Sequence, residues 1–136
     1  MLKDDYSNGY NWGYPDVPLS DFLGETFTKV AQVNNDEIIF THQSGRIFKM
    51  YHNQDCYESV SVEDIDGDLS QLIGDPILQA EEVVSNENPE GVTKEWQDSF
   101  TWTFYKLGTV KGYATIRWYG ESNGYYSESV SFYKTK

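Results

Sequence analysis

An internal repeat is the feature that most limits how this chain can fold. Residues 16–33 and 66–83 align at a shift of 50, and five aligned pairs are identical. These pairs are Asp16/Asp66, Leu19/Leu69, Ser20/Ser70, Gly24/Gly74 and Val33/Val83. A second match follows at a shift of 70, where residues 58–62 (ESVSV) resemble residues 128–132 (ESVSF). Two matches in the same order indicate a duplicated unit of about 55 residues.

Each unit is predicted to hold one short helix followed by four strands. Asp68 can cap the second helix, Gln71 can return that hydrogen bond, and Gly74 can end the helix. The strands of repeat A (about 16–65) are expected near 26–33, 37–43, 46–51 and 58–64. Those of repeat B (about 66–133) are expected near 77–84, 99–107, 113–120 and 125–133, with an acidic insertion at about 87–98.

Two local patterns in repeat B support this assignment. Phe100, Trp102 and Phe104 alternate with smaller or more polar residues, which gives a strand one apolar face. Asn123-Gly124 is typical of a type I′ hairpin turn. The sequence therefore predicts an α+β fold that is mostly antiparallel β. Two helix-plus-meander halves would pack as a single domain over residues 19–136.

Residues 1–18 differ from the rest and are expected to form an aromatic N-terminal arm. Tyr10, Trp12 and Tyr14 alternate here with glycine, asparagine and proline. One interpretation is an irregular arm whose rings cover the end of the core. The alternative is an arm that grips a partner or a second protomer in a homodimer, because Tyr and Trp are favoured interface anchors.

The acidic residues are concentrated in the middle of the chain. The net charge is −12, and residues 50–98 carry all of it, with thirteen acids against one base, Lys94. The acids are Asp55, Glu58, Glu63, Asp64, Asp66, Asp68, Asp75, Glu81, Glu82, Glu87, Glu90, Glu95 and Asp98. Such a charge opposes direct binding to nucleic acid or to an anionic membrane. The segment is either a solvated face that keeps the protein soluble or a binding surface.

The location of the chain can also be predicted. There is no apolar segment long enough to cross a bilayer and no apolar stretch of a signal peptide near Met1. The single cysteine, Cys56, cannot form an internal disulfide. A cytoplasmic protein is expected.

Three clusters are candidate sites of chemistry. His52, Asp55 and Cys56 invite a nucleophile interpretation, but the acidic surroundings would raise the pKa of a thiol. A metal site of His42, His52, Asp55 and Cys56 matches no zinc spacing. Residues 64–68 (DIDGD) resemble the start of a calcium loop, but Leu69 and Asp75 stand where that loop needs glycine and glutamate. We therefore expect no enzyme activity, no metal and no cofactor.

Several longer motifs resemble one small domain family. They are residues 51–56 (YHNQDC), 63–69 (EDIDGDL), 101–106 (TWTFYK) and 116–127 (IRWYGESNGYYS). The family is an uncharacterised one of bacteriophages and bacteria with no assigned activity. Its members often carry a second cysteine where this chain has Tyr57. The resemblance implies a phage setting, and hence the cytoplasm of a host bacterium, but no mechanism.

The first functional hypothesis is a non-enzymatic phage protein that inhibits a host defence nuclease or nucleic-acid-binding complex. Its carboxylates would take the place of phosphates in a basic groove of that host protein, as in anti-CRISPR or anti-restriction DNA mimics. The expected contact residues are Asp55, Glu58, Glu63, Asp64, Asp66 and Asp68, with Glu81 and Glu82 behind them.

The second hypothesis is a protein that sequesters a nucleotide signal of host immunity. Its pocket would be lined by Trp12, Tyr14, Trp102, Trp118 and Tyr119. The only bases available to hold phosphates would be Arg46, Lys49, Lys106, Lys111 and Arg117. A third alternative is an accessory phage protein with no role against host defence.

Overall fold

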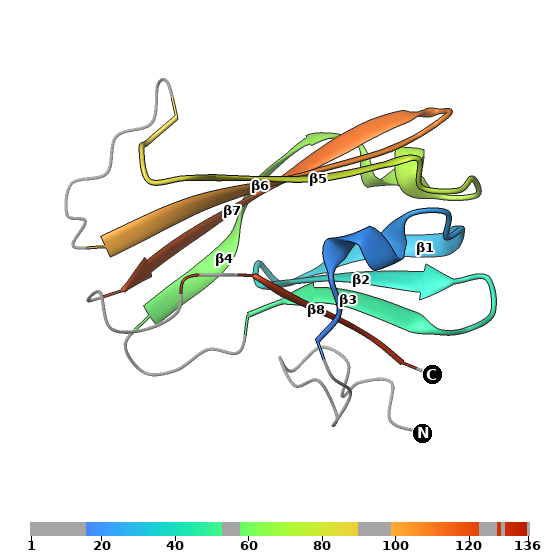
Figure 1. Cartoon of the computed structure of the whole chain (residues 1–136), viewed down its shortest axis with the longest axis horizontal. Helices are drawn as coiled ribbons and strands as arrows, with labels where there is room; N and C mark the ends of the chain where they lie inside the picture. Colours follow the sequence, from blue (N-terminus) through green and yellow to red (C-terminus); the bar gives the residue numbers. More distant parts are fainter. Residues whose placement is uncertain (1–15, 53–57, 90–98, 123–127, 129, 136) are drawn as a thin grey trace.

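In the described part of the chain, eight antiparallel strands form two four-stranded sheets that face each other (Figure 1). The computed structural model describes residues 16–52, 58–89, 99–122, 128 and 130–135. The first sheet has the order β1 (Phe27–Val33), β2 (Glu37–His42), β3 (Ile47–Tyr51), β8 (Ser131–Lys134). The second has the order β4 (Glu58–Gly67), β7 (Gly112–Ser122), β6 (Ser99–Thr109), β5 (Gln79–Ser85).

The helical content is smaller than the expected α+β class implies. The helices in the described part of the chain are two four-residue 3-10 helices, η2 (Leu19–Phe22) and η3 (Leu69–Leu72). A single turn of this kind cannot form a layer of its own. The fold observed is therefore mostly antiparallel β.

The fourth strand of each half of the chain belongs to the other half's sheet. β1, β2 and β3 form a meander, but β4 pairs with β7 and not with β3. Likewise β5, β6 and β7 form a meander, but β8 pairs with β3. The prediction of two self-contained meanders was therefore wrong in its strand pairing. The Asn123-Gly124 turn lies outside the described residues.

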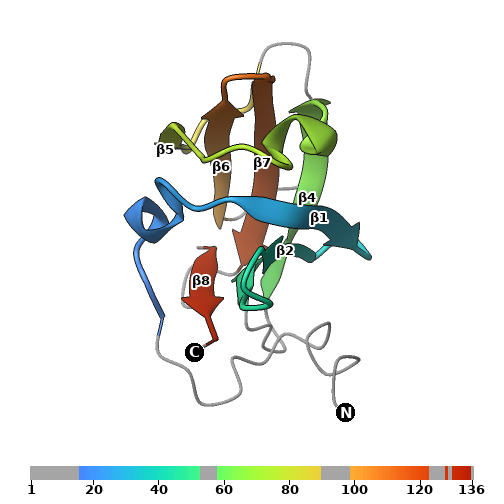
Figure 2. The same cartoon turned by 90° about the vertical axis from the view of Figure 1, so that its right-hand side faces the viewer.

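One apolar core fills the space between the sheets. Phe22 lies at its centre, with its ring 5.1 Å from those of both Phe40 and Phe48 and 5.8 Å from that of Phe132. From the second sheet, Trp118 and other buried side chains of β6 and β7 complete the core. In Figure 2, β1 crosses in front of β4, β6 and β7, and β2 and β8 lie below it. The shared core makes the two sheets one packing unit.

The helix caps in the second half agree with the sequence. Asp68 accepts a hydrogen bond from the backbone N–H of Ser70 at 2.9 Å, which confirms its N-cap role. Gly74, just beyond the C-cap, has φ +92°, in the region that favours glycine. Gly67 has φ +94°, and a Cβ there would lie 2.5 Å from the carbonyl oxygen of Tyr113. The turn between β4 and η3 therefore requires glycine.

The last residues of the expected arm lie against the domain. Val17 donates its backbone N–H to the carbonyl of Phe132 at 2.9 Å, and Asp16 forms an isolated bridge with Tyr133. Asp16 also accepts a hydrogen bond from the hydroxyl of Tyr51 at 2.9 Å. These residues cover the outer edge of β8.

Candidate functional site

The first group of expected acids follows the β4 edge of the second sheet. Asp64 and Asp66 pair with Arg117 and Thr115 of β7, so both side chains point away from the core. Glu63 lies at a bulge in β4, and Asp68 caps η3. Glu63, Asp64, Asp66 and Asp68 are all exposed, and we call them the β4 acidic edge.

The second group lies at the opposite edge of the same sheet. Glu81 and Glu82 are neighbours in β5, and strand alternation sends them to opposite faces. Glu81 pairs with Lys106 on the outer face, whereas Glu82 pairs with Tyr105 on the face toward the other sheet. The expected acids therefore form two separate groups.

Bases and aromatic residues separate these groups on the outer face. Arg117 of β7 and Phe104 of β6 form a cross-strand pair there. With Asp64, Asp66 and Thr115, they line a hollow of about 280 Å³. The outer face therefore does not present one continuous acidic field.

The side chains of two expected contact acids are not part of the described surface. Asp55 lies outside the described residues, and Glu58 is placed only as the first residue of β4. Glu90, Glu95, Asp98 and most of the predicted insertion are also outside them.

The aromatic residues expected to line a pocket are divided between two faces. The rings of Trp102 and Tyr119 are 4.5 Å apart on the outer face, with the guanidinium of Arg117 5.2 Å from the Trp102 ring. Trp102 is fully buried, and its indole N–H donates to the side-chain oxygen of Asn88 at 3.0 Å. Trp118 instead lies in the core between the sheets. The structure does not bring these three side chains together around one pocket, and Tyr10, Trp12 and Tyr14 lie outside the described residues.

Lys49, one of the bases expected to hold phosphate, is already paired. Its ammonium lies 2.7 Å from the Glu37 carboxylate, and the side chains are 0% and 1% exposed respectively. Burial lowers the pKa of Lys49, although the hydrogen bond and charge of Glu37 oppose that shift. Lys49 also lies 5.7 Å from the ring of Tyr51 and 5.8 Å from that of Tyr133. A phosphate could reach it only by displacing this pair.

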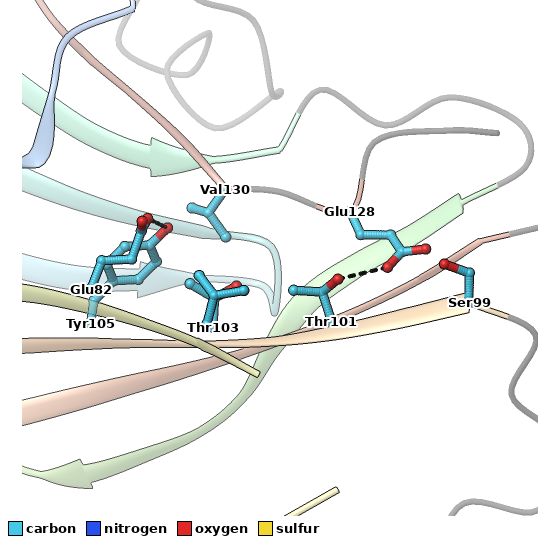
Figure 3. A pocket seen from close by; sticks show the side chains of 8 residues that line it. Glu82, Ser99, Thr101, Thr103, Tyr105, Glu128 and Val130 are labelled. Carbon is cyan, nitrogen blue, oxygen red and sulfur yellow. Dashed lines mark hydrogen bonds between the residues drawn. The ribbon is translucent and has the colours of Figure 1, made fainter. Parts of the chain in front are cut away.

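A groove on the inner face of β5 and β6 was not predicted from the sequence. It measures about 420 Å³, and Figure 3 shows the side chains that line it. We call it the β5–β6 groove. Its lining is Glu82, Val84, Ser99, Thr101, Thr103, Tyr105, Glu128 and Val130. Hydroxyl-bearing residues alternate along 99–105, which is a signal for such a groove, but the same alternation is also typical of the polar side of a strand with one apolar face.

Both carboxylates of the β5–β6 groove accept hydrogen bonds from its hydroxyls. Tyr105 donates to Glu82 at 2.8 Å, and Thr101 donates to Glu128 at 2.8 Å (Figure 3). Burial and Glu82 both raise the pKa of Tyr105 above its ordinary value. Burial also raises the pKa of Glu128, but hydrogen bonds from Ser122, Ser99 and Thr101 outweigh it and leave that pKa lowered. The groove is acidic, because no base contributes to its lining.

The sequence matches one protein family over most of its length. The match is to Domain of unknown function (DUF7448) and spans residues 20–132. The chain belongs to this family. No curated protein and no solved structure gave a significant match. Membership of DUF7448 confirms the expected resemblance to an uncharacterised domain family and assigns no activity.

The histidines of this DUF7448 domain have structural partners. The ring nitrogens of His42 lie 2.7 Å from Glu25 and 2.7 Å from Ser44, and the ring is stacked on Phe48. His52 is buried, whereas Asp55 and Cys56, the other expected metal ligands, lie outside the described residues. Within the described residues, no three His, Cys, Asp or Glu side chains cluster as metal ligands. Those residues also include no helix with the length and apolar character needed to span a membrane.

Proposed function

We propose that this protein is a non-enzymatic binding protein whose β4 acidic edge docks on a basic surface of another protein. One observation carries the proposal: Asp64, Asp66 and Asp68 are exposed along one edge, and none has a salt-bridge partner among the described residues. Unpaired carboxylates of like charge repel one another, and a cationic partner would relieve that repulsion.

The partner class proposed from the sequence is a host defence nuclease or nucleic-acid-binding complex. Proteins of this class carry basic grooves for phosphates, and opposite charge accelerates encounter with an acidic protein. The target would lie in the cytoplasm of a bacterial host. The separation of Glu81 and Glu82 from the β4 acidic edge narrows the docking surface proposed here to β4 and the start of η3.

A cleavage assay with purified bacterial defence nucleases tests this function. The protein should inhibit DNA cleavage by one of them, and the inhibition should weaken steeply as salt is raised. Reversing two charges together, Asp64→Lys and Asp66→Lys, should weaken inhibition by about tenfold or more.

Glu81→Lys together with Glu82→Lys provides a matched control, because it reverses two exposed carboxylates on the opposite edge of the same sheet. Its inhibition should stay close to that of the parent. Inhibition that is insensitive to both salt and the paired substitutions would contradict the proposal.

We also infer that the chain arose by duplication of a unit of one short helix and four strands. Equivalent positions support this origin: Phe22 and Leu72 are both fully buried, and Gly24 and Gly74 both have positive φ. The order of elements repeats, and β4 and β8 take equivalent places in the opposite sheets. An experimental structure in which residues 19–67 fail to superpose on residues 69–134 would contradict the inference.

A further inference from the structure

The β5 edge of the second sheet differs from the other sheet edges. The other three edge strands each receive a backbone contact from outside their sheet. These contacts are Val17 N–H to Phe132 O on β8, Gly74 N–H to Phe27 O on β1, and Val62 N–H of β4 to Asn35 O. Among the described residues, β5 pairs with β6 alone. No backbone hydrogen bond from outside the sheet reaches residues 79–85 among the described residues, although η2 packs against β5, so the outer backbone groups of β5 can pair with another strand.

The side chains of β5 are unusually exposed and partly apolar. Val83 and Val84 are 44% and 55% exposed, and Leu78 just before the strand is 61% exposed. A strand with an open edge and exposed β-branched residues is a template for strand addition. Glu81 and Glu82 add two exposed carboxylates.

The β5–β6 groove continues this edge inward. Glu82 and Val84 point toward it, so alternate side chains of a strand added beside β5 would enter it. Inside the groove, Thr103 is only 3% exposed and contributes a hydroxyl to the lining. A hydroxyl in the lining can donate a hydrogen bond to a ligand's polar group or accept one from it.

We propose that the β5 edge and the β5–β6 groove together bind an extended basic segment of another protein as an added β-strand. Main-chain hydrogen bonds to β5 would supply affinity. Lysine or arginine side chains directed inward would reach between Glu82 and Glu128, which lie toward opposite ends of the groove (Figure 3).

The charge of β5 favours a basic segment of another protein over a second copy of this chain. Antiparallel pairing of β5 with β5 of another molecule, centred on Glu82, would place the two Glu82 residues opposite each other with both Glu81 residues close by. Like charges on neighbouring strands are destabilising, whereas opposite charges are stabilising. This site is on the edge opposite to the β4 acidic edge, and the proposal does not depend on the function proposed above.

Fluorescence polarisation with a labelled seven-residue peptide, the length of β5, tests the inference on the full chain. The peptide alternates lysine with valine, and a peptide alternating glutamate with valine is the comparison. The lysine peptide should bind and the glutamate peptide should not. Hydrogen exchange should slow at the amides of residues 79–85 when the lysine peptide is bound.

Four variants separate strand addition from general attraction to an acidic protein. Glu82→Lys should weaken binding about tenfold, whereas Glu81→Lys, whose side chain lies on the opposite face of β5, should weaken it less. Asp66→Lys makes the same charge change on the opposite edge and should leave binding within about twofold of the parent. Thr103→Val, which removes only the hydroxyl, should weaken binding about threefold.

Three results would overturn the proposal. One is failure of the lysine peptide to bind, and another is equal weakening by Asp66→Lys and Glu82→Lys. The third is a concentration-dependent dimer in which residues 79–85 are protected without peptide, since the occupant would then be a second copy. None of these results would bear on nuclease inhibition through the β4 acidic edge.

Discussion

Lys49→Met should destabilise the protein by about 3–4 kcal/mol at pH 7 but by only about 1 kcal/mol at pH 5. The substitution keeps the length of the side chain and removes the cation that faces Glu37 at 2.7 Å. The side chains of Lys49 and Glu37 are at most 1% exposed, so the Glu37 carboxylate that remains would be an uncompensated buried charge. Breaking a buried pair from one side costs about 3–5 kcal/mol.

Protonation of Glu37 sets the upper limit of this loss. A carboxyl with an ordinary pKa of about 4.3 takes up a proton at pH 7 at a cost of about 3.7 kcal/mol, and at pH 5 for about 1 kcal/mol. Because a neutral carboxylic acid needs no cation, the variant should approach the parent's stability as the pH falls. At pH 7 the midpoint of thermal unfolding should fall by about 10–15 °C.

Urea unfolding followed by tryptophan fluorescence measures this effect at both pH values. The Lys134–Asp21 pair is the matched control, because its atoms are 3.1 Å apart and its side chains are 33% and 29% exposed. Lys134→Met should therefore cost less than about 1 kcal/mol. The double variant Glu37→Gln with Lys49→Met should recover most of the lost stability.

Two results would refute the reasoning about this pair. One is a loss below about 1 kcal/mol at pH 7, which would mean that the Glu37 carboxylate reaches water in the folded protein. The other is a loss that stays the same at pH 5, because proton uptake by Glu37 must reduce it.

Three further predictions follow from single contacts. Gly67→Ala should lower the free energy of unfolding, measured in urea, more than Gly74→Ala does. Both glycines have positive φ, but only at Gly67 would the new Cβ meet a backbone carbonyl. A larger loss for Gly74→Ala would contradict this prediction. Above pH 10 the free energy of unfolding should fall as pH rises, because the raised pKa of Tyr105 keeps its hydroxyl protonated in the folded state while the hydroxyl ionises in the unfolded state. Tyr105→Phe should remove this part of the pH dependence. Parallel pH profiles of the free energy of unfolding for the two proteins would contradict the prediction. Asp68→Ala should lower the melting temperature near pH 7, because it removes the cap of η3. Hydrogen bonds from Ser70 lower the pKa of Asp68, so the difference in melting temperature between variant and parent should vanish as the pH falls through that lowered pKa. A difference that persists in acid would exclude the cap as its cause.

Local patterns located the elements well because their causes are local. Seven expected strands overlap the observed ones closely, such as 37–43 against β2 (Glu37–His42) and 113–120 against β7 (Gly112–Ser122). Asp68 and Gly74 were identified as helix boundaries because caps depend on residues only a few positions apart. The last strand was the exception, since β8 (Ser131–Lys134) occupies only the end of the expected 125–133.

Candidate sites were harder to predict, because a site joins residues that the sequence keeps apart. The acids of 50–98 were visible in the sequence, but only strand pairing showed that Asp64 and Glu81 lie at opposite edges of one sheet. Glu128 is not among the site residues predicted from the sequence, because Thr101 and Glu82, which line the same groove, are distant from it in sequence. The Lys49–Glu37 pair was missed for the same reason.

The sequence by itself determined the strands, the turns, the caps and the repeated order of elements, since each depends on short-range periodicity and backbone preference. Tertiary structure alone decided which strands became neighbours. An apolar alternation such as that of β4 or β8 can be buried equally well in its own half's sheet or in the opposite one, so local pattern does not choose between them. Packing around the shared core made that choice, and it thereby left the β5 edge open and the β5–β6 groove beside it.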